Sequence, residues 1–272
     1  MQPSVKSSTH RPLVIAHRGW HKFHIENTLE AFKAAYDEGC DMVEFDVQLS
    51  RDGIPFVFHD DDGGRLAGRK AAVYDVDWKD IKDWVMPPGK GGNPGGYRIP
   101  TLEQFLTEFG SKSYYLELKV PKSRTQDERY WKTLGEKCAA LVTKTSPQPE
   151  TFLASFHAPI LSHLKRSNLF PRVVGIFENL DRFQEALTNK GSGIDRYSLS
   201  WGVYRSYLKS TGSAMGHART SSMGPPADKI LLWDIHSESD MEAAVKDGVY
   251  ALVADDAPTM LRALEKHGHS IP

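Results

Sequence analysis

The sequence lacks the features that mark several large classes of protein. It contains only two cysteines, Cys40 and Cys138, which are too few for a disulfide framework, and it has no Asn-x-Ser/Thr glycosylation acceptor. No run approaches the 18 or more apolar residues of a membrane-spanning helix, so we expect no integral membrane segment. The first ten residues are polar and contain no hydrophobic signal-peptide segment. We therefore expect a cytoplasmic protein.

An excess of charge of one sign is also lacking. The 272 residues include 34 Lys+Arg and 35 Asp+Glu, so the formal net charge is −1. A nucleic-acid-binding domain would show a basic face or stripe, and we expect no nucleic-acid partner. Hydrophobic residues make up 40% of the chain, which is enough for a full core. The sequence leaves the oligomeric state open.

Short apolar runs rich in β-forming residues alternate with stretches of helical spacing. Strands are predicted at 12–16, 41–48, 113–120, 151–156, 172–177, 196–201, 229–235 and 249–254. Helices are predicted at 27–38, 131–141, 160–164, 183–187, 241–245 and 260–264. Eight strands alternating with helices favour the α/β class and a single (β/α)8 TIM barrel over residues 1–272.

One region breaks this alternation. Residues of about 55–100 contain a short strand at 55–58 and a short helical pattern at 78–84. The Gly- and Pro-rich run at 87–96 can sustain neither helix nor strand. We therefore expect a small insertion between the second strand and its helix.

The second predicted strand carries two carboxylates on one face. Glu44 and Asp46 are two residues apart, and side chains alternate between the faces of a strand, so both point the same way. Inside a barrel, the two charges would repel each other and lose hydration unless something compensates them. A hard divalent cation does this with oxygen ligands. The alternative is an edge strand whose acidic face lies in water.

The third predicted strand repeats the pattern with Glu117 and Lys119 on one face. Glu117 can supply a third carboxylate to the same ion, and Lys119 then places a positive charge near an anionic substrate. A simple internal Glu–Lys ion pair is the alternative.

Two histidines follow predicted strands. His17 comes after the first strand with Arg18 next to it, and His59 comes after the short strand at 55–58. Barrel active sites lie at the carboxyl ends of the strands, so both are in the expected plane. Two histidines, a metal site and an arginine suit phosphoryl transfer, because they offer acid–base groups and a forked donor for phosphate oxygens.

Several short motifs occur in a fixed order along the first half of the chain. They are His17-Arg18-Gly19, Glu26-Asn27-Thr28, Glu44-x-Asp46, Asp52-Gly53, His59-Asp60, Ile99-Pro100-Thr101-Leu102-Glu103 and Glu117-Leu118-Lys119. In order and spacing, the chain resembles the glycerophosphodiester phosphodiesterase family. Ser155-Phe156 and Trp233 match later landmarks more diffusely.

The resemblance implies a barrel hydrolase that cleaves a small phosphodiester next to glycerol, giving an alcohol and glycerol phosphate, with Mg²⁺ or Ca²⁺ as cofactor. It implies roles for eight residues in three groups: the acid–base pair His17 and His59; the metal ligands Glu44, Asp46 and Glu117; and Arg18, Lys119 and Asn27 for the phosphate. We add two candidate substrate-binding residues at later strand ends, Trp233 as an apolar wall and His236, which completes ten predicted site residues. Asn27 and Glu30 also read as a capping box at the start of the helix at 27–38.

The chain departs from the family pattern at the ends of two late strands. The seventh-strand motif is Trp233-Asp234-Ile235-His236, and the last-strand motif is Asp255-Asp256-Ala257-Pro258. The polar residues at 234 and 236 can alter specificity for the leaving group or be structural. His21 and His24 fall in the first loop, where exposure to solvent is the expectation and a place in the pocket is the alternative.

Two other functions stay open. One is a phospholipase D-like enzyme or cyclising lyase that acts on lysophospholipids, which a cyclic phosphate product would reveal. The other is a non-catalytic barrel that binds phosphodiesters. The positions of the metal and acid–base residues are all filled by competent residue types, which favours hydrolysis.

Overall fold

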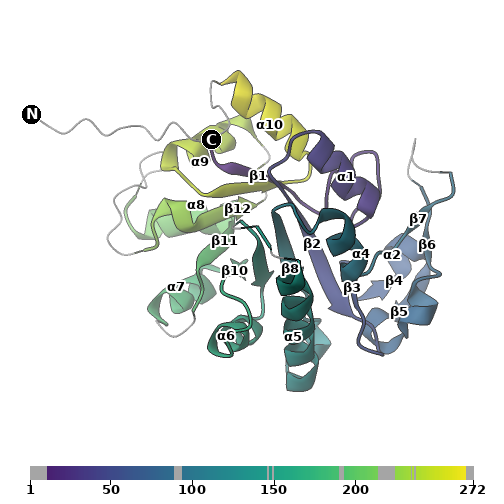
Figure 1. Cartoon of the computed structure of the whole chain (residues 1–272). Coiled ribbons are helices and arrows are strands. Elements are labelled where there is room, and N and C mark those ends of the chain that lie inside the picture. Colours follow the sequence, from purple (N-terminus) through teal and green to yellow (C-terminus); the bar gives the residue numbers. More distant parts are fainter. Residues whose placement is uncertain are drawn as a thin grey trace, which may run out of the picture.

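Parallel strands close into a barrel with helices around its outside (Figure 1). The computed structural model describes residues 11–88, 94–145, 147–148, 150–189, 193–213, 224–233, 235 and 237–267. The eight barrel strands are β1 (Leu13–Ala16), β2 (Met42–Leu49), β8 (Tyr114–Leu118), β9 (Phe152–Ser155), β10 (Val173–Phe177), β11 (Arg196–Ser200), β12 (Ile230–Trp233) and β13 (Ala251–Ala254). β1 pairs in parallel with both β13 and β2, which closes the ring. The predicted α/β barrel is confirmed.

Helices connect successive strands on the outer side of the barrel (Figure 1). They are α1 (Leu29–Asp37), α4 (Leu102–Phe109), α5 (Glu128–Lys144), α6 (Ala158–Arg166), α7 (Leu180–Thr188), α8 (Trp201–Ser210), α9 (Glu238–Asp247) and α10 (Ala257–Lys266). Single 3-10 turns occur at Val73–Asp75, Lys122–Arg124 and Ala227–Lys229. Among the described residues, no helix is long and apolar enough to cross a membrane.

The sequence patterns located all eight barrel strands but not every helix. α4, α8 and the short helix at Gly64–Ala67 were not among the predicted helices. The strand predicted to end at Trp201 ends one residue earlier, because Ser200 caps α8 through a bond from the backbone N–H of Val203. Trp201 is therefore the first residue of that helix.

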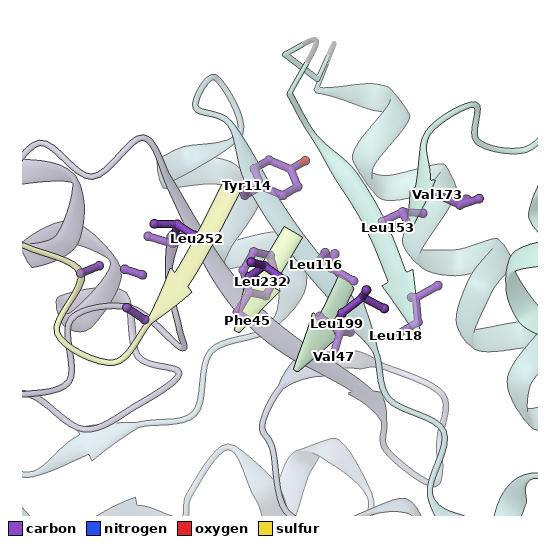
Figure 2. Close-up of a cluster of buried hydrophobic side chains, with 14 of the residues drawn as sticks. Phe45, Val47, Tyr114, Leu116, Leu118, Leu153, Val173, Leu199, Leu232 and Leu252 are labelled. Carbon is purple, nitrogen blue, oxygen red and sulfur yellow. The ribbon is translucent and has the colours of Figure 1, made fainter. Parts of the chain in front are cut away.

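Alternation along the barrel strands sorts side chains between two cores. Val43, Phe45 and Val47 of β2 face outward and join the layer between barrel and helices. Figure 2 shows part of this layer, with Phe45 and Val47 beside residues of other barrel strands. Met42 of β2 and Tyr115 of β8 face inward and belong to a smaller cluster that fills the barrel interior. This alternation places every second residue of β2 and β8 inside the barrel, where it is buried.

Between β2 and α4 along the chain there is a smaller group of elements, which lies at one side of the barrel (Figure 1). It comprises β3 (Pro55–Val57), β4 (Asp62–Gly63), α2 (Gly64–Ala67), β5 (Arg69–Ala72), α3 (Trp78–Ile81), β6 (Val85–Met86) and β7 (Tyr97–Arg98). β3 pairs antiparallel with the end of β2 and so carries the chain back along the barrel wall. These elements enclose their own apolar cluster, built around Phe56, Phe58 and Trp84.

Both cysteines are free and buried. Burial raises the pKa of Cys40 to about 12, and burial likewise raises the pKa of Cys138. Because the thiolate is the reactive form, we expect neither thiol to react with Ellman's reagent at pH 8 in the native protein, and both to react once guanidinium unfolds it. Prompt labelling of one thiol in the native state would contradict this burial.

Candidate active site

Two neighbouring strands bring three carboxylates together inside the barrel. Asp46 of β2 lies opposite Glu117 of β8 in the parallel register, and Glu44 lies two residues earlier on the same face. Their exposed fractions are 3% for Glu44, 1% for Asp46 and 7% for Glu117. One oxygen from each lies within 4.8 Å of the others. The edge-strand alternative is therefore wrong, because this acidic face is buried.

The electrostatics of the carboxylate cluster depend on burial and on one lysine. Burial and the charge of Asp46 raise the pKa of Glu44 to about 8, and burial also raises the pKa of Glu117. Burial alone would raise the pKa of Asp46 too, but Lys119 and other cations lower it. The Lys119 Nζ lies 3.2 Å from both Asp46 Oδ1 and Glu117 Oε1. The neighbouring cations thus lower the pKa of Asp46 but do not offset the burial of Glu44 and Glu117.

This donor set fits a hard divalent cation. All three groups offer oxygen atoms, they converge from rigid strands, and the raised pKa values of Glu44 and Glu117 show that their negative charge is not compensated by the protein alone. A cation with two charges would favour the ionised form of both groups.

The loop after β1 places Arg18 against the same carboxylates. The backbone N–H of Arg18 donates to Glu44 Oε2 at 2.9 Å, and the Arg18 Nε lies 3.5 Å from Asp46 Oδ2. The guanidinium also donates to Glu26 Oε1 at 2.8 Å. Arg18 has a φ of 55°, a conformation that is uncommon for a residue with a side chain and is held here by these contacts.

Asn27 supports Asp46 rather than the end of a helix. Its side-chain Nδ2 donates to Asp46 Oδ2 at 2.9 Å, and its side-chain Oδ1 accepts from the Asp46 backbone N–H at 3.3 Å. Thr28 is the residue that caps α1, accepting a hydrogen bond from the Ala31 backbone. The predicted capping box of Asn27 and Glu30 is therefore wrong: the left-handed backbone of Asn27, with a φ of 58°, turns its amide into the barrel.

Gly19 allows this loop to pass close to α1. Its φ is +77°, and a Cβ at this position would lie 2.7 Å from the carbonyl carbon of Ala31. We expect Gly19→Ala to displace the neighbouring Arg18 and to reduce kcat/KM by about 10²-fold, the effect of a misplacement of about 1 Å. Gly212→Ala is the matched control, since Gly212 has a similar φ of +69° but open space around it. Equal activity in the two variants would exclude this explanation.

His17 follows β1 and lies between two acidic groups. Its Nδ1 is 2.7 Å from Asp255 Oδ1, and its Nε2 is 3.9 Å from Glu44 Oε2. Burial lowers the pKa of His17, but the hydrogen bond with Asp255 and the charge of Glu44 outweigh it, so that the pKa is raised overall. With Nδ1 engaged, Nε2 is the ring nitrogen directed toward the carboxylate cluster.

His59 has a parallel arrangement at the end of β3. Its Nδ1 is 2.7 Å from Asp60 Oδ1, and Asp60 in turn receives two hydrogen bonds from Arg65, at 2.7 and 3.0 Å. Arg65 also bonds both oxygens of Glu26, the residue that holds Arg18. Burial lowers the pKa of His59. A continuous chain of charged groups therefore couples the orientation of this histidine to that of Arg18.

A cavity of about 690 Å³ opens over these groups at the carboxyl ends of the strands. His17, Arg18, Glu44, His59, Glu117 and Lys119 line its polar end. Apolar side chains, among them Phe156, Ile176 and Trp233, line another part of it, and further acidic residues such as Glu178 and Glu238 lie on its wall as well. The structure thus brings nine of the ten predicted site residues to this cavity or its immediate support, and the tenth, His236, lies outside the described residues, as does Asp234.

The sequence analysis missed the acidic partners of the two histidines. Asp60 was visible as the residue next to His59. Asp255 was predictable from topology, since Ala16 pairs with Ala254 where the first and last strands meet, and His17 and Asp255 each follow by one residue.

Comparisons with known proteins agree with this geometry. The profile of the Glycerophosphoryl diester phosphodiesterase family matches residues 17–196. A glycerophosphodiester phosphodiesterase of Caldanaerobacter subterraneus subsp. tengcongensis is 25% identical over 260 residues, covering 95% of this chain and all of the relative.

Solved structures share the fold over nearly the whole chain. A putative glycerophosphoryl diester phosphodiesterase from Silicibacter pomeroyi has a TM-score of 0.76 at 19% identity, with 95% of each chain covered. A phosphodiesterase from Oleispira antarctica, solved with the product sn-glycerol-3-phosphate, has a TM-score of 0.71 at 24% identity, with 94% of this chain and 97% of that chain covered.

Proposed function

Because the chain belongs to the glycerophosphoryl diester phosphodiesterase family, we propose that it hydrolyses a glycerophosphodiester to an alcohol and glycerol phosphate in the cavity above its three buried carboxylates. The observation that carries this proposal is the convergence of Glu44, Asp46 and Glu117 within 4.8 Å, beside two histidines in one cavity. The relative from Oleispira antarctica binds sn-glycerol-3-phosphate, the product expected here.

Glu44, Asp46 and Glu117 would hold the metal ion, for which Mg²⁺ and Ca²⁺ are both suitable because each prefers oxygen ligands. When bound, such an ion neutralises negative charge on the phosphoryl oxygens and so stabilises the transition state. Asn27 keeps the Asp46 carboxylate in place by bonding its Oδ2 and its backbone N–H. These hydrogen bonds restrict rotation of the Asp46 side chain, so that its carboxylate keeps a fixed orientation toward the ion.

Arg18 and Lys119 are the cations that bind the phosphate. Arg18 offers a planar fork of donors, while the Lys119 ammonium is a point charge already drawn to the carboxylates at 3.2 Å. Both line the polar end of the cavity, so the phosphate is held beside the metal ligands. The glycerol part and the alcohol then extend toward the mouth.

His17 and His59 move the protons. The Nδ1 atom of each is engaged by an aspartate at 2.7 Å, which leaves Nε2 as the atom that exchanges a proton with the substrate. One histidine accepts the proton of the attacking oxygen, and the other donates a proton to the leaving alkoxide. Two histidines at the ends of different strands allow both transfers in one turnover.

The apolar wall supports a second candidate substrate class. Phe156 is 40% exposed although it is a large apolar side chain, and its ring lies 6.4 Å from that of Trp233. A cavity of about 690 Å³ with such a wall has room for more than glycerol phosphate. We propose lysophospholipids, whose acyl chain would contact this wall, as the alternative to small water-soluble diesters.

A substrate screen with product analysis tests both candidates. The purified protein is given glycerophosphodiesters with choline, ethanolamine, inositol and glycerol heads, and lysophosphatidylcholine, each with Mg²⁺, Ca²⁺ or EDTA. Phosphorus NMR identifies glycerol phosphate, lysophosphatidic acid or a cyclic phosphate. We expect metal-dependent release of glycerol phosphate. Metal binding without cleavage of any of these diesters would instead support a non-catalytic barrel.

A further inference from the structure

A second group of metal-ligating side chains lies at the mouth of the barrel, on the side of His17 away from the carboxylate cluster. His17 Nδ1 is 2.7 Å from Asp255 Oδ1, and His21 Nε2 is 3.4 Å from the same oxygen. The three ligand atoms of His17, His21 and Asp255 all lie within 4.8 Å of one another. We call these three residues the outer cluster.

One ring nitrogen of His21 is directed at this cluster. The side chain, expected to face solvent, is partly exposed at 27%, but its Nε2 atom is shielded and has no hydrogen bond of regular geometry to any described residue. Its ring packs edge-on against His17 with centroids 6.5 Å apart. A shielded ring nitrogen directed at a carboxylate and a second imidazole is an available ligand atom.

Asp255 is free to bind an ion with the two histidines. The nearby Lys22 ammonium pairs with Asp256 at 2.9 Å, and Trp20 donates to the same residue at 3.1 Å. The neighbouring cation therefore does not compete for Asp255. The side chain of Asp255 is 66% exposed, so its carboxylate can shift to meet an ion.

The chemistry of the outer cluster differs from that of the carboxylate cluster. Two imidazole nitrogens and one carboxylate are ligands typical of Zn²⁺, whereas Mg²⁺ and Ca²⁺ prefer oxygen alone. Tetrahedral coordination with bonds of about 2.0–2.2 Å places ligand atoms about 3.3–3.6 Å apart. The 3.4 Å between His21 Nε2 and Asp255 Oδ1 matches this, and the 2.7 Å between His17 Nδ1 and Asp255 Oδ1 would lengthen as the exposed carboxylate shifts. We propose that His17, His21 and Asp255 form a second metal site that binds Zn²⁺, and that Zn²⁺ bound there inhibits the enzyme.

The inhibition follows from the use of both nitrogens of one imidazole, and it rests on the proposed function of His17. Zn²⁺ at Nδ1 binds the neutral tautomer whose one proton is on Nε2: an imidazolium releases its Nδ1 proton to solvent, and a ring protonated on Nδ1 alone releases that proton while Nε2 takes one up from solvent. With the ion on Nδ1 and a proton on Nε2, the ring cannot take up a further proton. His17 therefore can no longer alternate between imidazole and imidazolium, although Glu44, Asp46 and Glu117 still hold their own ion.

Binding is tested separately from catalysis. Zn²⁺ is titrated by calorimetry into the Mg²⁺-saturated protein, and into the Glu44→Gln variant, whose carboxylate cluster is incomplete. We expect one Zn²⁺ bound in both. His21→Ala should weaken this binding at least tenfold, because one of three protein ligands is lost, and His21→Gln should do the same. His24→Ala is the matched control in the same loop and should bind Zn²⁺ unchanged.

Inhibition is then measured with excess Mg²⁺. We expect Zn²⁺ to inhibit the wild type and His24→Ala equally, and to inhibit His21→Ala only at concentrations at least tenfold higher, with its activity without Zn²⁺ unchanged. Added Mg²⁺ should not relieve the inhibition. Equal Zn²⁺ affinity in His21→Ala and the wild type would overturn the site itself. Zn²⁺ binding that depends on His21 in a protein without diesterase activity would uphold the site and reject the proposed function instead.

Discussion

Replacing any one of the three buried carboxylates by its amide will remove metal-dependent turnover while the protein still folds. We expect Glu44→Gln, Asp46→Asn and Glu117→Gln each to lower kcat by about 10³-fold or more, because a bound divalent cation contributes several kcal/mol of transition-state stabilisation. Calorimetric titration with Mg²⁺ and Ca²⁺ should show weak or no binding to each variant. Unchanged turnover after treatment with EDTA would exclude the metal site.

Thermal unfolding separates this loss from misfolding. The raised pKa of Glu44, to about 8, means that its ionised form is unfavourable in the metal-free protein. A neutral glutamine removes that cost, so metal-free Glu44→Gln should unfold at the same temperature as the wild type or at a higher one. The wild type should gain stability when Mg²⁺ is added, since the ion binds only the folded state, and the variant should not. A metal-free variant that unfolds well below the wild type would indicate a structural role instead.

Loss of either histidine will also be severe but will leave the metal in place. We expect His17→Ala and His59→Ala each to lower kcat by about 10²- to 10⁴-fold, the range for a positioned acid or base. The affinity for Mg²⁺ should stay within a few-fold, because neither histidine belongs to the carboxylate trio. Steady-state kinetics and calorimetry on the same preparations measure both quantities.

The two histidine variants have an internal control. His24 is a loop histidine whose Nδ1 contacts the hydroxyl of Tyr97 at 3.2 Å, and it does not line the cavity. His24→Ala should therefore keep its activity. Full activity in His17→Ala or His59→Ala would remove that residue from the mechanism, and the retained activity of His24→Ala shows that a general effect of losing a histidine is not being measured.

Much of the barrel was predictable because its strands are short and apolar with clear boundaries. The alternation in β2 predicted Glu44 and Asp46 on one face and Val43, Phe45 and Val47 on the other. In the structure the three apolar residues lie in the outer core, and the two carboxylates are buried outside that core. A side-chain period of two residues is a property of any strand, so it needs no knowledge of the neighbours.

Two of the unpredicted helices, α4 and α8, have starts that hydrophobic periodicity does not mark. α4 begins at a capping box of Thr101 and Gln104, a signal that was present in the sequence beside the glycine- and proline-rich run. α8 begins directly after β11, with no loop to separate the strand pattern from the helix pattern. Where two elements join at one residue, hydrophobic periodicity alone cannot locate the boundary.

The parts of the site that were missed depend on contacts between distant residues. Asn27, in the loop before α1, has a left-handed backbone, and its side chain is bound to the Asp46 carboxylate of β2. Nothing in the local sequence distinguishes this residue from a helix cap. The contact of His21 Nε2 with Asp255 Oδ1 likewise joins residues that are far apart in the sequence. Such placements arise from tertiary packing, which local patterns do not encode.

The meeting of β1 with β13 has a consequence for the order of events in folding. His17 follows β1, but its partner Asp255 lies 238 positions later, just beyond the strand that closes the ring. A partly folded chain in which β1 and β13 have not yet paired thus carries the histidine without the group that orients it. Closure of the ring is the event that brings the two residues together.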